Sequence, residues 1–173
     1  MTGAEPAAAP RVVVAGVSGS GKSTLGAALA ARLGVPFVDG DDLHSEAAKA
    51  KMHRGEPLTD ADRAPWLDRV AAALAAPRGV VIACSALKRA YRDRLRAAAP
   101  SAVTLVLEAP RAVLEARLRA RHGHFMPARL LDSQLATLEP PQPDEPRTAA
   151  VNDDAPANTV LAQAARLVGE LAR

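Results

Sequence analysis

The stretch Gly16-Val-Ser-Gly-Ser-Gly-Lys-Ser23 decides the fold of this chain. It matches the pattern G-x-x-x-x-G-K-[ST], whose glycines let the backbone curl so that successive N–H groups face a phosphate. An apolar run at 12–15 precedes it, and leucines recur at helical spacing over 22–33 behind it. That order of strand, loop and helix disfavours the alternative of a glycine-rich turn that matches by chance. The residues expected to bind nucleotide phosphates are Gly16, Val17, Ser18, Gly19, Ser20, Gly21, Lys22, Ser23 and Thr24.

Two side chains of this stretch carry specific chemistry. Lys22 is expected to place a compact positive charge between the β- and γ-phosphates, and the Ser23 hydroxyl to complete the coordination of magnesium. A GTPase would need a base-reading N-K-x-D segment, and the sequence contains none. We therefore expect ATP and Mg²⁺ as the ligands of this loop.

Strand and helix patterns alternate along the rest of the chain. The predicted strands are 12–15, 35–38, 79–83, 103–107 and 148–151, and the predicted helices are 22–33, 88–99, 110–121, 128–138 and 158–171. Residues 43–74 are predicted to form several short helices, broken at 55–57 and at Pro65. This alternation predicts an α/β P-loop NTPase fold of three layers, with a five-stranded parallel sheet flanked by helices.

The expected domain organisation is simple. At 173 residues the chain is long enough for one domain with a real core and too short for two of ordinary size. We expect a disordered tail over 1–10 and a single domain over 11–173. Within that domain, residues 43–74 should form a substrate-binding lobe and residues 121–129 approximately a lid.

Composition excludes several classes of protein. The net charge is only +3, which does not indicate the basic stripe of a nucleic-acid-binding protein, and no apolar stretch is long enough to cross a membrane. Cys84 is the single cysteine, so no intramolecular disulfide can form, and a reducing, cytoplasmic location is expected. Its thiol is either reactive or a small group at the buried end of a strand, and we favour the second interpretation.

An acidic pair follows the second predicted strand. Asp39 and Asp41 are separated by one residue, an arrangement that resembles small-molecule kinases similar to shikimate kinase. The resemblance implies that Asp39 supports magnesium through water and that Asp41 faces the acceptor hydroxyl as a general base. Asp42 should point elsewhere. The alternative is that 39–42 forms a solvated turn.

A larger set of segments resembles the gluconokinase family. Besides the phosphate-binding stretch these are Asp39-Gly-Asp-Asp-Leu-His44, Lys51-Met52, Gly55-Glu-Pro-Leu58, Asp62-Arg-Ala-Pro-Trp-Leu67, Ala83-Cys-Ser-Ala-Leu-Lys-Arg89, Tyr91-Arg-Asp93, Gly123-His-Phe125 and Ser133-Gln134. The match extends from about Val12 to Pro140, and the order and spacing of the segments are jointly specific. It implies transfer of the γ-phosphoryl group of ATP to the 6-hydroxyl of D-gluconate by a homodimer.

The resemblance also implies which side chains act. Gluconate carries a carboxylate and a row of hydroxyls, so its pocket needs both cations and hydrogen-bond acceptors. The residues expected to bind it are Asp41, His44, Arg63, Lys88, Arg89 and Arg92. Arg121 resembles a lid arginine that closes on the ATP phosphates. Lys22, Asp41 and Arg121 are thus the expected catalytic residues.

Several of these side chains have alternative interpretations. Arg63, Arg89 and Arg92 could instead form surface ion pairs with Asp62 or Asp93. His44 either donates to a substrate hydroxyl or caps the first helix of the lobe. Trp66 is expected in the core rather than stacked on a ligand.

The sequence departs from the family pattern at three positions. Ser45 and Ala48 stand where proline and asparagine are common, and Asn152 stands where an acid is common. These departures bear on fine substrate preference and on the adenine contacts. A kinase for another small hydroxy acid or a nucleotide, and a nucleotide-binding module without turnover, are the remaining alternatives.

Overall fold

The computed structural model describes residues 8–121 and 128–173, which form a parallel sheet in the order β2-β3-β1-β4-β5. The strands are β1 (Arg11–Ala15), β2 (Phe37–Asp39), β3 (Val80–Ala83), β4 (Val103–Glu108) and β5 (Thr148–Asn152). The α-helices are α1 (Lys22–Leu33), α2 (Glu46–His53), α3 (Asp60–Leu74), α4 (Arg89–Ala98), α5 (Arg111–Ala120), α6 (Ala128–Thr137) and α7 (Ala157–Leu171). A short 3₁₀ helix, η1 (Gly40–Leu43), follows β2. The predicted α/β fold and its five-stranded sheet are confirmed.

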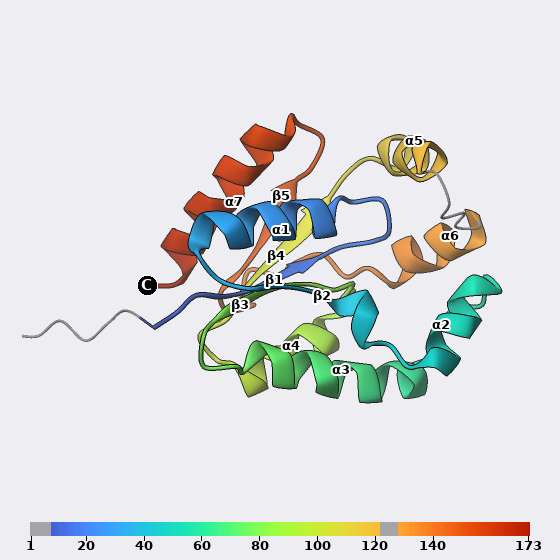
Figure 1. Ribbon diagram of the computed structural model, residues 1–173. Coiled ribbons are helices and arrows are strands. Elements are labelled where there is room, and N and C mark those ends of the chain that lie inside the picture. Colours follow the sequence, from blue (N-terminus) through green and yellow to red (C-terminus); the bar gives the residue numbers. More distant parts are fainter. Residues whose placement is uncertain (1–7, 122–127) are drawn as a thin grey trace, which may run out of the picture.

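The sheet is buried on both faces by helices (Figure 1). Helices α1 and α7 cover one face, where Val12 and Val14 of β1 join a buried cluster with Leu29 and Val160. On the other face, Val13 joins the cluster formed by residues of α3 and α4. Successive residues of a strand point to opposite faces, and a parallel sheet covered on both sides therefore consists of continuous apolar runs. The run Val12 to Ala15 has this character.

The strand order reverses beside β1, and this places the functional site. In the order β2-β3-β1-β4-β5, strands β3 and β2 lie on one side of β1, and the later strands β4 and β5 lie on its other side. In open α/β sheets, ligands bind in the crevice that such a reversal leaves at the carboxyl ends of the strands. Helices α2, α5 and α6 lie beyond that edge, away from the chain termini (Figure 1).

Helix α3 and the N-terminal tail differ from the prediction. Helix α3 continues through Pro65, which was expected to break it. Proline removes the N–H that would bond the carbonyl four residues earlier. The helix tolerates this loss because a capping box of Thr59 and Asp62 begins it and four buried side chains, those of Trp66, Leu67, Val70 and Leu74, anchor it. The expected tail also ends earlier, since the Pro10 carbonyl accepts a hydrogen bond from Val80 N at 3.0 Å; residues 1–7 lie outside the described residues.

A buried ion pair fixes the proline-rich connection before β5. The Arg92 guanidinium donates to both carboxylate oxygens of Glu145, at 2.6 and 3.0 Å, and both side chains are fully buried. The same guanidinium donates to the carbonyls of Ala86 and Leu87. Every polar edge of this pair is therefore satisfied within the protein, as a buried charge requires.

Removing one partner of this pair should be strongly destabilising. We expect Glu145→Ala to lower the free energy of unfolding by about 3–5 kcal/mol, because it leaves Arg92 charged and uncompensated in the interior. Thermal and urea unfolding followed by circular dichroism measure this change. The neighbouring variant Asp144→Ala removes an exposed partner of Arg89 and should leave stability nearly unchanged. Equal effects of the two variants would contradict the assignment of Glu145.

Candidate active site

The phosphate loop between β1 and α1 has the geometry that binds anions. Gly21 precedes α1 with φ at 77° and is its N-cap residue, so no capping side chain bonds the first N–H groups of the helix. A Cβ at Gly21 would lie 3.2 Å from Oδ2 of Asp153, and the positive φ would strain any other residue. The amides at this helix N-terminus and its dipole together favour a bound phosphate.

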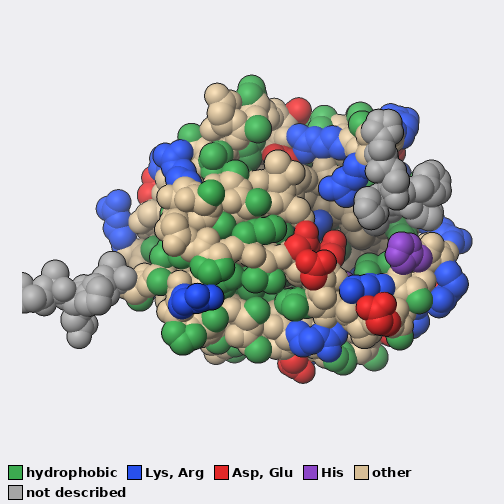
Figure 2. All heavy atoms as spheres, in the orientation of Figure 1, with side chains coloured by type: hydrophobic (Ala, Val, Ile, Leu, Met, Phe, Trp, Pro, Cys, Tyr) green, Lys and Arg blue, Asp and Glu red, His purple; other side chains and the backbone are tan. Residues whose placement is uncertain are grey.

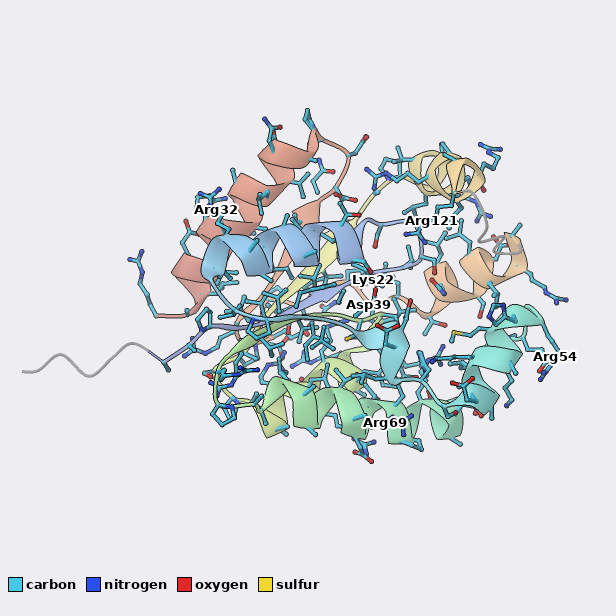
Figure 3. The ribbon with its side chains drawn as sticks, in the orientation of Figure 1. Lys22, Arg32, Asp39, Arg54, Arg69 and Arg121 are labelled. Atoms are coloured by element: carbon cyan, nitrogen blue, oxygen red, sulfur yellow. The ribbon has the colours of Figure 1, made fainter. Side chains whose placement is uncertain are left out.

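Lys22 lies at the inner end of this loop. Its Nζ is 3.5 Å from the Val17 carbonyl, and burial lowers the pKa of the ammonium below its ordinary value, while the negative charge of Asp41 opposes this shift. The positive charge of Arg121 lowers the pKa further. The charges of Asp41 and Arg121 therefore both act on Lys22, and the catalytic roles of the three residues stay a prediction. Figure 3 shows Lys22 next to Asp39 at the edge of the sheet, with Arg121 approaching from the end of α5.

Ser23 and Asp39 place two potential metal-ligand oxygen groups beside Lys22. The Ser23 hydroxyl donates to Asp39 Oδ2 at 2.9 Å, and Asp39 Oδ1 accepts the backbone N–H of Asp41 at 3.0 Å. A hydroxyl and a carboxylate are the oxygen ligands that Mg²⁺ prefers, with water and substrate phosphates completing its shell. The donor set thus fits the predicted role of Ser23 and Asp39.

The segment after Asp39 is held close to the sheet. A Cβ at Gly40 would lie 2.6 Å from the Ala83 carbonyl oxygen, so only glycine allows η1 to approach β3 this closely. The Trp66 indole donates to the Gly40 carbonyl at 2.7 Å and stacks on His44, with ring centroids 4.5 Å apart. Trp66 is buried in the core, as expected. These contacts fix the backbone on which Asp41 and His44 stand.

His44 presents a neutral imidazole at this site. Burial lowers its pKa below the ordinary value, with the positive charges of Arg63 and Arg69 adding to the effect and Asp41 opposing it. Its Nδ1 is buried and has no hydrogen-bond partner among the described residues. The alternative of a helix cap does not hold, because the hydroxyl of Ser45 caps α2 by accepting the N–H of Ala48.

A cavity of about 100 Å³ brings three of the predicted acceptor residues, Asp41, His44 and Arg63, together with residues of the phosphate loop. The residues that line it are Ser18, Lys22, Asp41, His44, Met52, Glu56, Pro57, Leu58, Arg63, Ser85, Leu87, Leu130, Ser133 and Gln134. On the face shown in Figure 2, acidic and basic side chains gather around the recess at this edge of the sheet. The cavity thus combines cations with hydrogen-bond acceptors.

Three predicted acceptor residues lie elsewhere. Lys88 pairs with Asp60 and lies over the Tyr91 ring, Arg89 pairs with Asp144, and Arg92 is fully buried against Glu145. None of the three lines the cavity. The prediction that Arg92 contacts substrate is wrong, because the contacts described above occupy its guanidinium. For Arg89 the alternative of an ion pair holds, including a contact with Asp93 at 3.6 Å.

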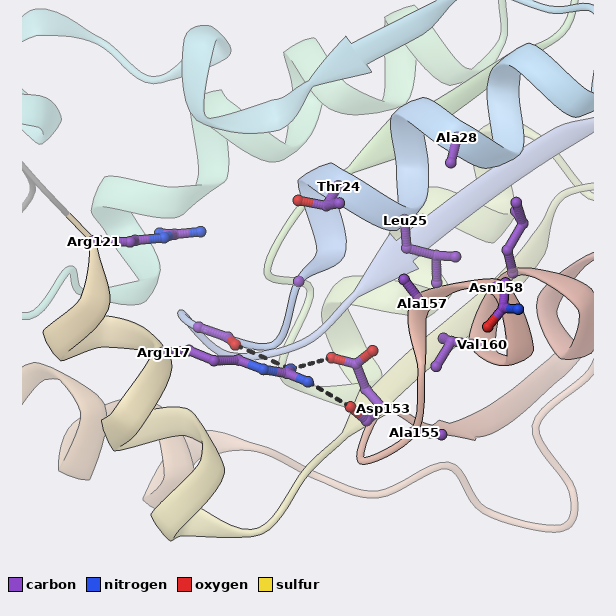
Figure 4. Close-up of a pocket in the computed structure, with 13 residues that line it drawn as sticks. Thr24, Leu25, Ala28, Arg117, Arg121, Asp153, Ala155, Ala157, Asn158 and Val160 are labelled. Carbon is purple, nitrogen blue, oxygen red and sulfur yellow. Dashed lines mark hydrogen bonds and ion pairs between the residues drawn. The ribbon is translucent and has the colours of Figure 1, made fainter.

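A second cavity, of about 460 Å³, lies on the other side of the phosphate loop. It is lined by α1, by α5 and by the segment that leads from β5 into α7 (Figure 4). Arg117 lines this cavity and pairs with the Asp153 carboxylate. Its guanidinium also donates to the Asp153 carbonyl at 2.7 Å and to the Gly19 carbonyl at 3.4 Å. Arg121 also borders this cavity. The position of this cavity next to the loop and its size suit the nucleoside of a bound nucleotide.

Arg117 and Asp153 were not among the residues predicted from the sequence. Arg117 precedes Arg121 by one helical turn, and this i, i+4 spacing was the signal that could have identified it. Asp153 has no such local signal. Its role depends on β5 lying beside β4.

The predicted lid at about 121–129 is described only at its ends. Residues 122–127, which include His122, His124 and the segment Gly123-His-Phe125, lie outside the described residues. At the far end, Arg129 of α6 donates to the Arg54 carbonyl at 2.8 Å. Helix α6 therefore contacts the end of α2.

Cys84 is predicted to be chemically inert in the native protein. The thiol is fully buried, and burial raises its pKa to about 12. Since the thiolate is the reacting species, a thiol reagent such as DTNB should leave Cys84 unmodified at pH 8 and label one thiol per chain in denaturant. Stoichiometric labelling of the native protein at the denatured rate would contradict this placement.

The sheet order, the loop and its helix define a P-loop nucleotide-binding protein of the α/β class. A family model described as an AAA domain matches residues 12–141. A gluconokinase from Gluconobacter oxydans (strain 621H) is 51% identical over 139 residues, which cover 78% of each chain. The crystal structure of a gluconokinase from Sinorhizobium meliloti 1021 superimposes with a TM-score of 0.89 at 45% identity, covering 96% of this chain and 95% of that one. The chain belongs to the gluconokinase family, which confirms the resemblance found in the sequence.

A more distant structure supports the fold alone. A shikimate kinase from Bacteroides thetaiotaomicron has a TM-score of 0.67 at 22% identity, covering 92% of this chain and 98% of that one. In the part of the chain that the structure describes, no helix has the length and apolar character to span a membrane.

Proposed function

We propose that this protein transfers the γ-phosphoryl group of ATP to the 6-hydroxyl of D-gluconate. The observation that carries the proposal is that Lys22 of the phosphate loop and Asp41 line the same cavity as His44 and Arg63. A phosphoryl donor bound by the loop would meet a small polyhydroxy acid there. Membership of the gluconokinase family supports the choice of acceptor.

The residues that line the cavity have different roles in the proposed reaction. Asp41 accepts the proton of the acceptor hydroxyl. At the same time the hydroxyl oxygen bonds to the γ-phosphorus, and the bond between that phosphorus and the ADP oxygen breaks. Lys22 stabilises the negative charge that develops on the transferring group and on the leaving oxygen. Arg63 offers a guanidinium to the acceptor carboxylate, and the neutral imidazole of His44 offers a hydrogen bond to a hydroxyl. The proposal does not include Lys88, Arg89 or Arg92 among the acceptor ligands.

Magnesium is part of the proposal. The Ser23 hydroxyl would hold it directly, and Asp39 would hold it through water. When bound, the ion would neutralise charge on the β- and γ-phosphates. Arg121 would add a second positive charge on the side of the nucleotide cavity that it borders.

The proposal extends to location and assembly. We infer a cytoplasmic protein, which fits the single, buried cysteine. We also infer a homodimer, on the family resemblance. Analytical ultracentrifugation over a hundredfold range of concentration tests the dimer, and a single monomeric species throughout would contradict it.

A panel of acceptors tests the function. ADP release by the purified protein with ATP and magnesium should be fast with D-gluconate and slow with shikimate, glycerate, AMP or no acceptor. The two alternatives, a kinase for another hydroxy acid and a non-catalytic module, predict a different preferred acceptor and no release at all, respectively. The similarity to gluconokinases favours neither alternative.

A further inference from the structure

The Ser133-Gln134 segment resembles the family pattern and has no role in the mechanism described so far. Helix α6 directs one face at the acceptor cavity, through Leu130, Ser133 and Gln134. Residues three and four apart lie on the same side of a helix, so these three form one wall. Lys22 and Asp41, which carry the proposed chemistry, line the same cavity.

Gln134 also contacts the phosphate loop directly. Its Oε1 accepts the backbone N–H of Ser18 at 2.7 Å, across 116 residues of sequence. Because a backbone N–H can only donate, the side-chain atom that faces it must be the amide oxygen. This bond fixes the orientation of the whole amide, and the two donors on Nε2 are turned away from Ser18.

The contact distinguishes Ser18 from the residues at the start of α1. The N–H of Ser18 is occupied by Gln134, whereas the amides at the start of α1 stand at a helix N-terminus capped by a glycine. Ser18 and Gln134 both line the acceptor cavity. Gln134 therefore lies at the junction between the phosphate loop and the acceptor, with fixed donors available to an acceptor oxygen.

We propose that Gln134 is an acceptor-binding residue that positions the acceptor relative to the phosphate loop. Its Nε2 donates to a hydroxyl or carboxylate oxygen of the acceptor, while its Oε1 holds Ser18. The acceptor and the loop are thereby connected through one rigid amide. This inference rests on the proposed function, since it needs an acceptor that carries oxygen atoms with lone pairs.

Two variants separate the halves of this role. Gln134→Glu keeps an oxygen for the Ser18 N–H but removes both donors and adds a negative charge that repels an anionic acceptor. Gln134→Met removes the donors without adding charge, and it also removes the oxygen that accepts the Ser18 N–H. We expect both to raise the KM for gluconate about tenfold or more, the loss typical of a hydrogen bond to a charged group. For Gln134→Glu, the loss in affinity for a non-hydrolysable ATP analogue without acceptor should be smaller than the rise in KM for gluconate, although the added charge also repels the phosphates.

Gln163→Glu on α7 is the matched control, because it makes the same substitution at a half-buried glutamine that lines neither cavity. It should leave both constants unchanged, and thermal melting confirms that all variants fold. An unchanged KM for gluconate in both Gln134 variants overturns the inference, as does a loss confined to nucleotide affinity. If wild type itself fails to phosphorylate gluconate, the proposed function fails instead, and the two results are thereby distinguished.

Discussion

Asp41→Asn is expected to lower kcat for gluconate phosphorylation by about 10²- to 10⁴-fold, the range attributed to general acid–base catalysis. The amide has the same shape as the carboxylate but cannot accept the acceptor proton at neutral pH. Asp41 is exposed at the acceptor cavity, and its charge acts on Lys22. Nucleotide affinity should not fall, because removing a negative charge near the phosphates reduces repulsion. Steady-state kinetics and binding of an ATP analogue measure the two effects separately.

The neighbouring aspartate supplies the control for this prediction. Asp42 is also exposed and lies in the same 3₁₀ helix, but it does not line the acceptor cavity. Asp42→Asn makes the same chemical change one residue away and should retain nearly full activity. A loss shared equally by Asp41→Asn and Asp42→Asn would indicate a general effect of charge or of η1, and would remove Asp41 from the role of base.

Lys22→Met is the second large change, with an expected loss in kcat of about 10²- to 10³-fold, similar to removal of one charge-stabilising donor in other active sites. Methionine keeps the length of the side chain without its charge. In wild type, burial lowers the pKa of Lys22, so the ammonium loses its proton at a lower pH than a free lysine. The kcat/KM for ATP reports the free enzyme. It should therefore fall on the alkaline side before pH reaches the ordinary lysine value, and Lys22→Met should lack this limb.

Lys49→Met is a suitable comparison, since Lys49 stands on α2 and pairs only weakly with the exposed Glu46 at 3.4 Å. It should leave kcat and the pH profile unchanged. An alkaline limb that persists unaltered in Lys22→Met would assign it to another group.

The phosphate loop and the fold could be predicted because their signals are local. The glycine pattern, the apolar run before it and the leucines after it occupy one short stretch, and alternation of strands and helices fixes a parallel sheet. Asp39 and Asp41 could be proposed as site residues for the same reason, since they stand at the end of one strand, β2. Pro65 does not break α3, because the tertiary burial of this helix outweighs one lost hydrogen bond.

The arginines of α4 could not be assigned in this way. Nothing in the local sequence distinguishes an Arg that points to substrate from one that is buried. The direction of Arg92 depends on Glu145, 53 residues later, and that of Arg89 on Asp144. The contacts that Gln134 and Asp153 make with the phosphate loop could not be predicted either. Each residue reaches the loop only through the folded arrangement of α6 and β5. Site residues whose partners are distant in sequence become visible only in the structure.

The identity of the phosphorylated product tests the central claim most directly. Wild-type protein would be incubated with ATP, magnesium and D-gluconate, and the product examined by proton-coupled phosphorus NMR. We expect one new phosphomonoester whose phosphorus couples to the two protons of a primary carbon, as phosphate on the 6-hydroxyl requires. A phosphorus that couples to a single proton, or inorganic phosphate as the only product, would contradict transfer to that hydroxyl.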